Sequence, residues 1–119
     1  MDEGYVEAVL SLVEQVPPGR ATTYGSLADA VGVGGPRLVG RVMSQYGAGV
    51  PWWRVVRADG STQDFLVAKA ARHWRAEGTP LRERPDGAVR VDLSRAAHHP
   101  QELPPPRRRS SLGPPSPGG

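Results

Sequence analysis

Cysteine does not occur anywhere in this 119-residue sequence. Its absence excludes disulfide bonds, thiolate metal sites and catalysis by a thiol nucleophile. Long apolar runs are also missing, and none approaches the roughly 20 residues needed to cross a bilayer. Residues 1–4 lack the basic and apolar regions of a secretory signal. We therefore expect a cytoplasmic protein that does not associate with membranes.

Because cysteine is absent, few side chains remain that could bind a metal ion. The three histidines, His73, His98 and His99, are not accompanied by cysteines or by carboxylates at ligand spacing. We expect no metal site and no other cofactor.

The formal net charge is only +3, but the charges are unevenly distributed. Residues 94–119 contain four arginines and one glutamate, which account for the whole excess. In the rest of the chain, residues 1–19 carry four acids and no base, whereas residues 20–57 carry five arginines and one aspartate. This asymmetry predicts that a polyanionic partner contacts the middle segment.

Three stretches near the start of the chain have the apolar spacing of amphipathic helices. The first covers residues 2–16 and stops at a Pro-Pro-Gly sequence. The second can be capped by Thr22 or Thr23 and stops at Gly32. The third begins at Pro36, a residue that suits the first turn of a helix. Two short helices joined by a glycine-rich turn predict a helix-turn-helix.

The next part of the chain predicts a wing. Residues 52–57 have strand composition and lead into a turn signal, which favours a β-hairpin. A last helix is predicted over 66–77, and alternating apolar residues predict a short closing hairpin over 81–93. The fold class is therefore α+β and mainly helical: a winged helix-turn-helix domain over residues 1–93, with a small β-hairpin wing. Residues 94–119 are rich in proline, glycine and arginine, and we expect a disordered tail.

The third predicted helix carries candidate contacts for nucleic acid. Arg37 lies in its first turn, Arg41 follows one turn later on the same face, and Ser44 lies beyond. Such side chains can reach phosphates or base edges. Two arginines on an exposed helix face also fit a merely solvated surface, so their spacing alone does not identify a function.

Four short motifs in a fixed order are more specific than any of these patterns. The motifs are PGRATTYGSLA at 18–28, PRLVG at 36–40, VPWWRVV at 50–56 and RAEG at 75–78. Together they resemble the DNA-binding domain of O6-alkylguanine-DNA alkyltransferases, over roughly residues 5 to 93. Because Tyr5 already lies in the first helix of the matched part, we expect no counterpart of the family's separate N-terminal domain.

The resemblance implies that catalysis is lost. In the family a histidine, oriented by a glutamate, deprotonates a cysteine, which then takes the alkyl group from the guanine oxygen. Trp52 stands at the cysteine position and Trp53 at the histidine position, while Glu77 remains without its expected partner. Neutral indole is neither an adequate nucleophile nor a base. The alkyltransferase-like subgroup also replaces the cysteine with tryptophan, although it usually keeps the histidine. We therefore expect no enzymatic activity.

A pocket for the damaged base is implied by the same resemblance. Trp52 can stack on an extruded base without reacting with it. A second interpretation is that the two tryptophans belong to the core, since adjacent strand residues face opposite sides and one of them packs inside. The expected pocket residues are Val50, Pro51, Trp52, Trp53 and Glu77.

The resemblance also assigns roles around that pocket. Tyr24 presses on the phosphate of the target nucleotide and helps to rotate it out, and Arg37 fills the gap that the base leaves. The recognition helix enters the minor groove. Gly40 permits close helix packing, and segment 61–68 closes over the extruded base.

The sequence thus predicts a non-enzymatic sensor that binds O6-alkylguanine in double-stranded DNA and flips the damaged nucleotide. By resemblance, it flags the lesion for nucleotide excision repair proteins. Two alternatives stay open at this point: a winged-helix regulator that reads sequence without flipping a base, and a transferase with an unconventional acceptor. We expect a monomer that joins the nucleoid when it binds DNA.

Overall fold

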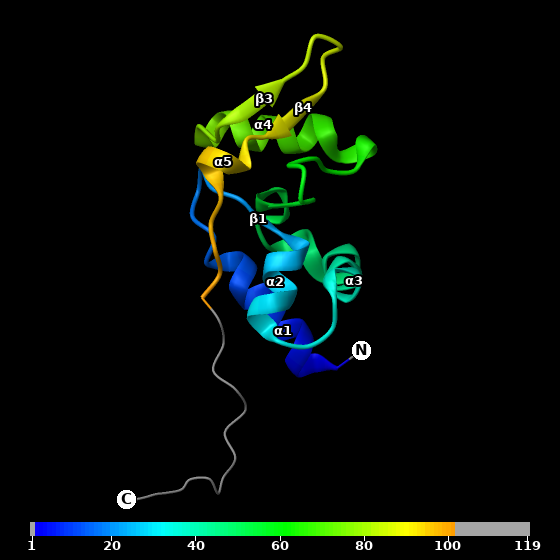
Figure 1. Cartoon of the computed structure of the whole chain (residues 1–119). Coiled ribbons are helices and arrows are strands. Elements are labelled where there is room, and N and C mark those ends of the chain that lie inside the picture. The colour runs from blue at the N-terminus through cyan, green and yellow to red at the C-terminus, as the bar shows by residue number, and fades with distance from the viewer. Residues whose placement is uncertain (1, 102–119) are drawn as a thin grey trace, which may run out of the picture.

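Short helices make up most of the fold, because capping residues and glycines interrupt the chain at short intervals. The computed structural model describes residues 2–101 (Figure 1). Within this part of the chain, no helix is long and apolar enough to cross a membrane. The elements in chain order are α1 (Glu3–Glu14), β1 (Thr22–Thr23), α2 (Tyr24–Val31), α3 (Pro36–Tyr46), η1 (Gly47–Gly49), η2 (Trp52–Arg54), β2 (Val55–Val56), η3 (Asp64–Leu66), α4 (Val67–Glu77), β3 (Leu81–Glu83), β4 (Val89–Val91) and α5 (Leu93–Ala96).

Helices α2 and α3 form the predicted helix-turn-helix. Thr23 caps α2, and its hydroxyl accepts a hydrogen bond from the backbone N–H of Ser26 at 3.0 Å. Gly32 ends α2 with a φ of 91°, in the left-handed region that favours glycine. Pro36 is the first residue of α3. Helix α1 packs against both of these helices (Figure 1).

The buried apolar side chains form two clusters, and strand β2 contributes to both. Val55 and Val56 are neighbours in β2 and therefore point to opposite faces. Val55 joins the cluster made by α1, α2 and α3, whereas Val56 joins the cluster made by α4, β4 and α5. Both side chains are almost completely buried, and burial of each stabilises the fold by roughly 1.5–3 kcal/mol. Trp52 and Trp53 pack against the second cluster at this boundary.

The predicted hairpin directly after the helix-turn-helix is wrong. Residues 52–54 form the 3-10 turn η2, which follows Pro51 and is closed by a hydrogen bond from Arg54 N to Pro51 O at 3.0 Å. Strand β2 then pairs with β1 in parallel, so it does not turn back on the following segment. The antiparallel hairpin of the described chain is β3–β4, which corresponds to the closing hairpin predicted over 81–93.

The predicted start of the tail at Ser94 is too early. Helix α5 and the residues after it pack on the domain: Ala96 is fully buried. The Arg20 side chain donates hydrogen bonds to the carbonyl oxygens of Ala96 at 3.2 Å and Ala97 at 2.8 Å. Composition predicted disorder here, but these backbone contacts fix the segment. Residues 102–119 of the predicted tail lie outside the described residues.

Candidate nucleic-acid interface

A pocket of about 270 Å³ lies between the helix-turn-helix and the segment that precedes α4. Helix α3 lines it with Gly40, Met43 and Ser44, and η2 contributes Trp52. The loop that ends in η3 supplies further lining residues. This volume is at the small end of the range for ligand sites, so the pocket suits one flat ring system.

Three aromatic side chains contribute to the wall of this pocket. Tyr24 from the start of α2, Trp52 from η2 and Phe65 from η3 all line it. Phe65 is 79% exposed, which is unusual for a large apolar ring and costs hydrophobic free energy in water. A ring held at the rim of a pocket can recover that cost by stacking on a flat ligand. The sequence did not single out Phe65, although it lies in the predicted closing loop.

Tyr24 presents a neutral hydroxyl at the pocket. Burial raises the pKa of its phenol above the usual value of 10.0, and the nearby positive charge of Arg57 offsets this only partly. The hydroxyl is therefore protonated at neutral pH. It can donate a hydrogen bond to a phosphate oxygen.

The outer face of α3 carries the predicted arginines. Arg37 and Arg41 are exposed and flank a shallow hollow together with Leu38. Gly40 lies on the same helix, but a side chain placed there would meet no neighbouring atom within 4 Å. The predicted role of Gly40 in close helix packing is therefore wrong, because the missing side chain instead leaves room at the pocket wall.

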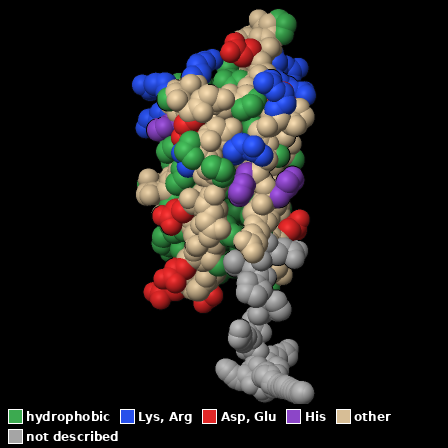
Figure 2. Space-filling model, turned by 90° about the vertical axis from the view of Figure 1, so that its left-hand side faces the viewer, with side chains coloured by type: hydrophobic (Ala, Val, Ile, Leu, Met, Phe, Trp, Pro, Cys, Tyr) green, Lys and Arg blue, Asp and Glu red, His purple; other side chains and the backbone are tan. Residues whose placement is uncertain are grey.

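Charged side chains are separated along the molecule. On the face that Figure 2 shows, several acidic side chains lie at the end that holds α1, and most basic ones lie toward the β3–β4 end. Two of the five arginines at 20–57 already bind groups of the protein: Arg20 donates to the carbonyls of Ala96 and Ala97, and Arg54 pairs with Glu77. Arg37, Arg41 and Arg57 are exposed and are not among the arginines that form ion pairs within residues 2–101.

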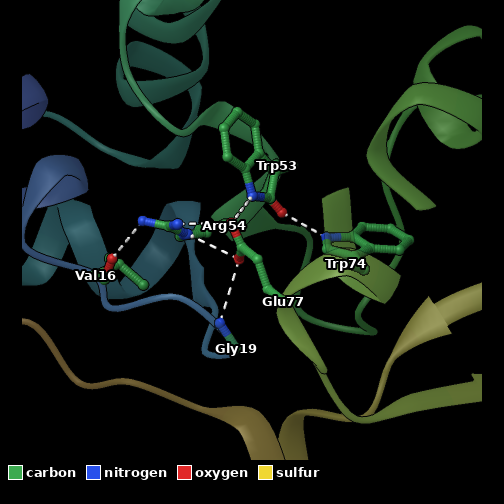
Figure 3. Close-up of polar contacts among 6 residues, drawn as sticks. All are labelled: Val16, Gly19, Trp53, Arg54, Trp74 and Glu77. Carbon is green, nitrogen blue, oxygen red and sulfur yellow. Dashed lines mark hydrogen bonds and ion pairs between the residues drawn. The ribbon is translucent and has the colours of Figure 1, made fainter. Parts of the chain in front are cut away.

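Glu77 is the centre of a hydrogen-bond network in which Trp53, at the position of the expected histidine, is itself a donor (Figure 3). Trp53 Nε1 donates to Glu77 Oε2 at 2.9 Å. Arg54 donates to both carboxylate oxygens, from Nε to Oε1 at 3.1 Å and from Nη2 to Oε2 at 2.6 Å. The backbone N–H of Gly19 donates to Oε1 at 3.2 Å. The carboxylate thus accepts hydrogen bonds from three residues in two parts of the chain, Gly19 and the neighbours Trp53 and Arg54.

The charge of Glu77 follows from this network. Burial alone raises the pKa of the carboxyl group, because it disfavours the charged form. The hydrogen bonds from Arg54, Trp53 and Gly19 outweigh burial, and the net result is a pKa below the ordinary 4.5. Glu77 is therefore a carboxylate at neutral pH, and its oxygens are occupied.

Trp53 is fixed on several sides. Its carbonyl oxygen accepts a hydrogen bond from Trp74 Nε1 at 2.7 Å, and its ring stacks on His73 with centroids 3.6 Å apart and planes 7° from parallel. His73 was considered only as a metal ligand in the sequence. Its spacing of four residues from Glu77 on a predicted helix was the available signal, because that spacing places both side chains on one face.

The predicted site residues fall into two groups. Tyr24, Ser44 and Trp52 line the pocket, and Arg37 and Arg41 lie on the exposed face of α3. The remaining predicted pocket residues do not line it: Val50 is buried in the first apolar cluster, and Trp53 and Glu77 belong to the network behind Trp52. Pro51 is half-buried and precedes η2. Thr62, Gln63, Phe65 and Leu66 come from the segment that was expected to close over the base, whereas Met43 and the small residues of α3 and η1 are lining residues that the sequence did not indicate.

Comparison with known proteins identifies this arrangement. Residues 5–79 match the family described as 6-O-methylguanine DNA methyltransferase, DNA binding domain. A DNA base-flipping protein of Vibrio parahaemolyticus serotype O3:K6 is 33% identical over 88 residues, which cover 70% of this chain and 87% of that protein. The chain therefore belongs to the family of 6-O-methylguanine DNA methyltransferase DNA-binding domains.

Two solved structures share the fold. S. pombe Atl1, in complex with damaged DNA containing O6-carboxymethylguanine, has a TM-score of 0.72 and 25% identity, covering 84% of this chain and 99% of that chain. S. pombe ATL, in complex with DNA, has a TM-score of 0.70 and 29% identity, covering 84% of this chain and 98% of that chain. The resemblance to alkyltransferase-like proteins and the mainly helical fold, with a helix-turn-helix and a small wing, are thereby confirmed.

Proposed function

We propose that this protein binds duplex DNA, extrudes an O6-alkylguanine nucleotide into the pocket beside α3 and holds it there without removing the alkyl group. The observation that carries this proposal is the position of Trp52. This residue lines a pocket of about 270 Å³, and in the motif it occupies the position of the family's nucleophile. The complexes of similar S. pombe proteins with DNA support it, as does the base-flipping relative.

The pocket and α3 contribute to different parts of base flipping. Extrusion costs a few kcal/mol in lost stacking and pairing. Trp52 and Phe65 recover part of that free energy by contact with the extruded ring, and Tyr24 donates a hydrogen bond to the phosphate of the rotated nucleotide. The guanidinium of Arg37 enters the minor groove and fills the gap in the stack, while Arg41 and Ser44 contact the backbone.

Transfer chemistry has no group to perform it. The chain contains no cysteine, and the indole of Trp52 is not a nucleophile under physiological conditions. Trp53 cannot act as a base, since its ring nitrogen donates a hydrogen bond to Glu77. Glu77 in turn accepts four hydrogen bonds and does not reach the pocket. The bound lesion then remains on the DNA and serves as a flag for nucleotide excision repair proteins, with the sensor acting as a monomer.

The deciding experiment is a fluorescence titration with two duplexes of identical sequence, one of which contains a single O6-methylguanine. Both are measured at the same salt concentration, because phosphate contacts make every affinity salt-dependent. We expect tighter binding to the damaged duplex. Equal affinities for the two duplexes refute lesion recognition.

Arg37→Ala distinguishes a sensor from a regulator that reads sequence. In a sensor this substitution lowers the preference for the lesion more than the affinity for undamaged DNA. In a regulator it lowers the affinity for one sequence, and the lesion has no effect. Arg41→Ala is the matched control, for which we expect weaker binding to both duplexes and a salt dependence reduced by about one phosphate contact.

Transfer activity is tested with DNA that carries a radiolabelled methyl group at the guanine oxygen. We expect no label on the protein after incubation. Label on the protein would establish an acceptor other than cysteine.

A further inference from the structure

The stack of Trp53 on His73 joins the helix that carries Glu77 to the wall of the pocket. The two rings are nearly parallel, with an interplanar angle of 7° and centroids 3.6 Å apart. His73 lies one turn before Glu77 on α4, so both side chains reach Trp53 from the same helix face. His73 itself does not line the pocket.

Several contacts hold Trp53 in place. Glu77 accepts a hydrogen bond from its ring nitrogen, and Trp74 donates one to its carbonyl oxygen. The guanidinium carbon of Arg54 lies 5.4 Å from the centroid of the Trp53 ring, within the range of a cation–π contact. Figure 3 shows the hydrogen bonds of Trp53 with Glu77 and Trp74, both of which lie on α4. With His73 on the ring face, Trp53 forms a fixed aromatic platform.

Trp52 rests against this platform at a right angle. Its ring centroid lies 5.7 Å from that of Trp53 with an interplanar angle of 86°, and 6.0 Å from that of His73 with an angle of 81°. Both contacts have the edge-to-face geometry that aromatic rings prefer. Trp52 lies in the short turn η2, which supplies no other ring contact within the described residues. The platform therefore decides which way the plane of Trp52 faces.

We propose that His73 is a positioning residue for the lesion pocket. It completes the platform of Trp53 and thereby holds Trp52 with the orientation that lines the pocket. This inference rests on the proposed function, because it describes how that pocket is built. Removing the His73 ring leaves Trp52 with one edge contact instead of two and frees one face of Trp53. Selection for the damaged base then weakens, although no DNA contact has been removed.

The test combines His73→Ala with His73→Phe, which restores a ring that can stack. His99→Ala is the matched control, since His99 is exposed and takes part in no aromatic contact within the described residues. We expect His73→Ala to reduce the ratio of affinities for damaged and undamaged duplex roughly 2- to 10-fold, which corresponds to the free energy that one aromatic pair contributes. Affinity for the undamaged duplex stays unchanged, and His73→Phe restores most of the ratio.

Near-ultraviolet circular dichroism supplies a readout that does not depend on DNA. We expect His73→Ala to change the tryptophan bands while the far-ultraviolet spectrum remains that of the wild type, and His73→Phe to recover them in part. Unchanged tryptophan bands in His73→Ala overturn the inference. So does an unchanged affinity ratio where the wild type prefers the lesion.

The two proposals can fail separately. If the wild type shows no lesion preference but His73→Ala changes the tryptophan bands, the proposed function fails and the positioning of Trp52 by His73 stands. If His73→Ala does not fold, His73→Leu fills the same space without a ring. The same two measurements then apply to that variant.

Discussion

Two adjacent tryptophans occupy opposite environments in this domain. Trp52 lines an open pocket with Tyr24 and Phe65. Within the described residues, its ring takes part in no hydrogen bond. Trp53 is bonded to Glu77, stacked on His73 and anchored through its carbonyl to Trp74. The residues of the pocket are available to a ligand, whereas the polar groups of the network are satisfied within the protein.

This difference separates recognition from stability among the residues that match the family's catalytic motif. In the family, the glutamate and the histidine both serve to activate the cysteine, which takes the alkyl group from the guanine oxygen. Here the cysteine position faces a cavity, while the histidine and glutamate positions have become part of a structural network with Arg54. Glu77 on α4 ties the loop at Gly19 and the turn η2 to its own helix, three segments that are far apart in the sequence. Variants of the two regions should therefore have separable effects.

Glu77→Gln is expected to have the largest effect on folding. It breaks an ion pair whose side chains are only 13% and 14% exposed, and it leaves the buried guanidinium of Arg54 without its carboxylate. The cost of such a loss is about 3–5 kcal/mol. Urea denaturation of the variant measures it. Glu83→Gln is the control, because the pair of Glu83 with Arg75 is 62% and 54% exposed and contributes at most about 1 kcal/mol. Equal losses in the two variants would show that the network has no special role.

Trp52→Ala is expected to have the next largest effect, and on binding instead of folding. Removing a ring that stacks on a base costs about 1–3 kcal/mol, which corresponds to roughly 5- to 150-fold weaker binding of the damaged duplex. Fluorescence anisotropy with damaged and undamaged duplex measures the change. Affinity for undamaged DNA should hardly change.

Trp53→Phe sharpens the comparison between the two tryptophans. It keeps a ring on His73 but loses the hydrogen bond to Glu77, so it should lower stability more than Trp52→Ala does. If instead Trp53→Phe abolishes lesion preference while Trp52→Ala leaves it intact, the assignment of the two environments is reversed.

The parts of this molecule that depend on neighbouring residues could be predicted from the sequence. Thr23 as a cap, Gly32 as a stop and Pro36 as a start need only local backbone geometry, and they delimit the helix-turn-helix. The order of motifs around Trp52 likewise placed that residue in the pocket.

Other parts depend on residues that are distant in the chain. The parallel pairing of β1 with β2 joins Thr22 to Val55, and no local signal distinguishes it from a hairpin. Arg54 was expected to face a polyanion, but its partner Glu77 lies on α4, 23 residues away. The contacts of Trp53 with residues of α4 could not be predicted either, because those residues are also distant in the sequence. Charge counting along the chain cannot show which arginines a buried carboxylate has already bound.

Phe65→Ala is expected to have a smaller effect on binding than Trp52→Ala, because the ring of Phe65 lies at the rim and is 79% exposed in the free protein. We expect the damaged duplex to bind about 1 kcal/mol more weakly, close to a 5-fold change. Phe65→Tyr keeps the ring and should retain the wild-type affinity. Thermal stability should not fall in either variant. A loss of stability in Phe65→Ala would mean that the ring packs on the domain instead of serving the ligand.

The smallest expected effect is a difference in acid sensitivity between the wild type and Glu77→Gln. The pKa of Glu77 is lowered in the folded protein from its ordinary 4.5, because the hydrogen bonds of Arg54, Trp53 and Gly19 outweigh burial. A lowered pKa gives a contribution to stability that is present above the ordinary value and is lost as the pH falls through the lowered one. The free energy of unfolding of the wild type should therefore decline below about pH 4.5 more steeply than that of Glu77→Gln. Asp59 and Asp92 also have lowered pKa values, through hydrogen bonds from Ser61 and Ser94, but they are present in both proteins and cancel in the comparison. Parallel declines in the two proteins would show that the carboxylate of Glu77 gains nothing from its partners, and Trp53 would then be held by packing alone.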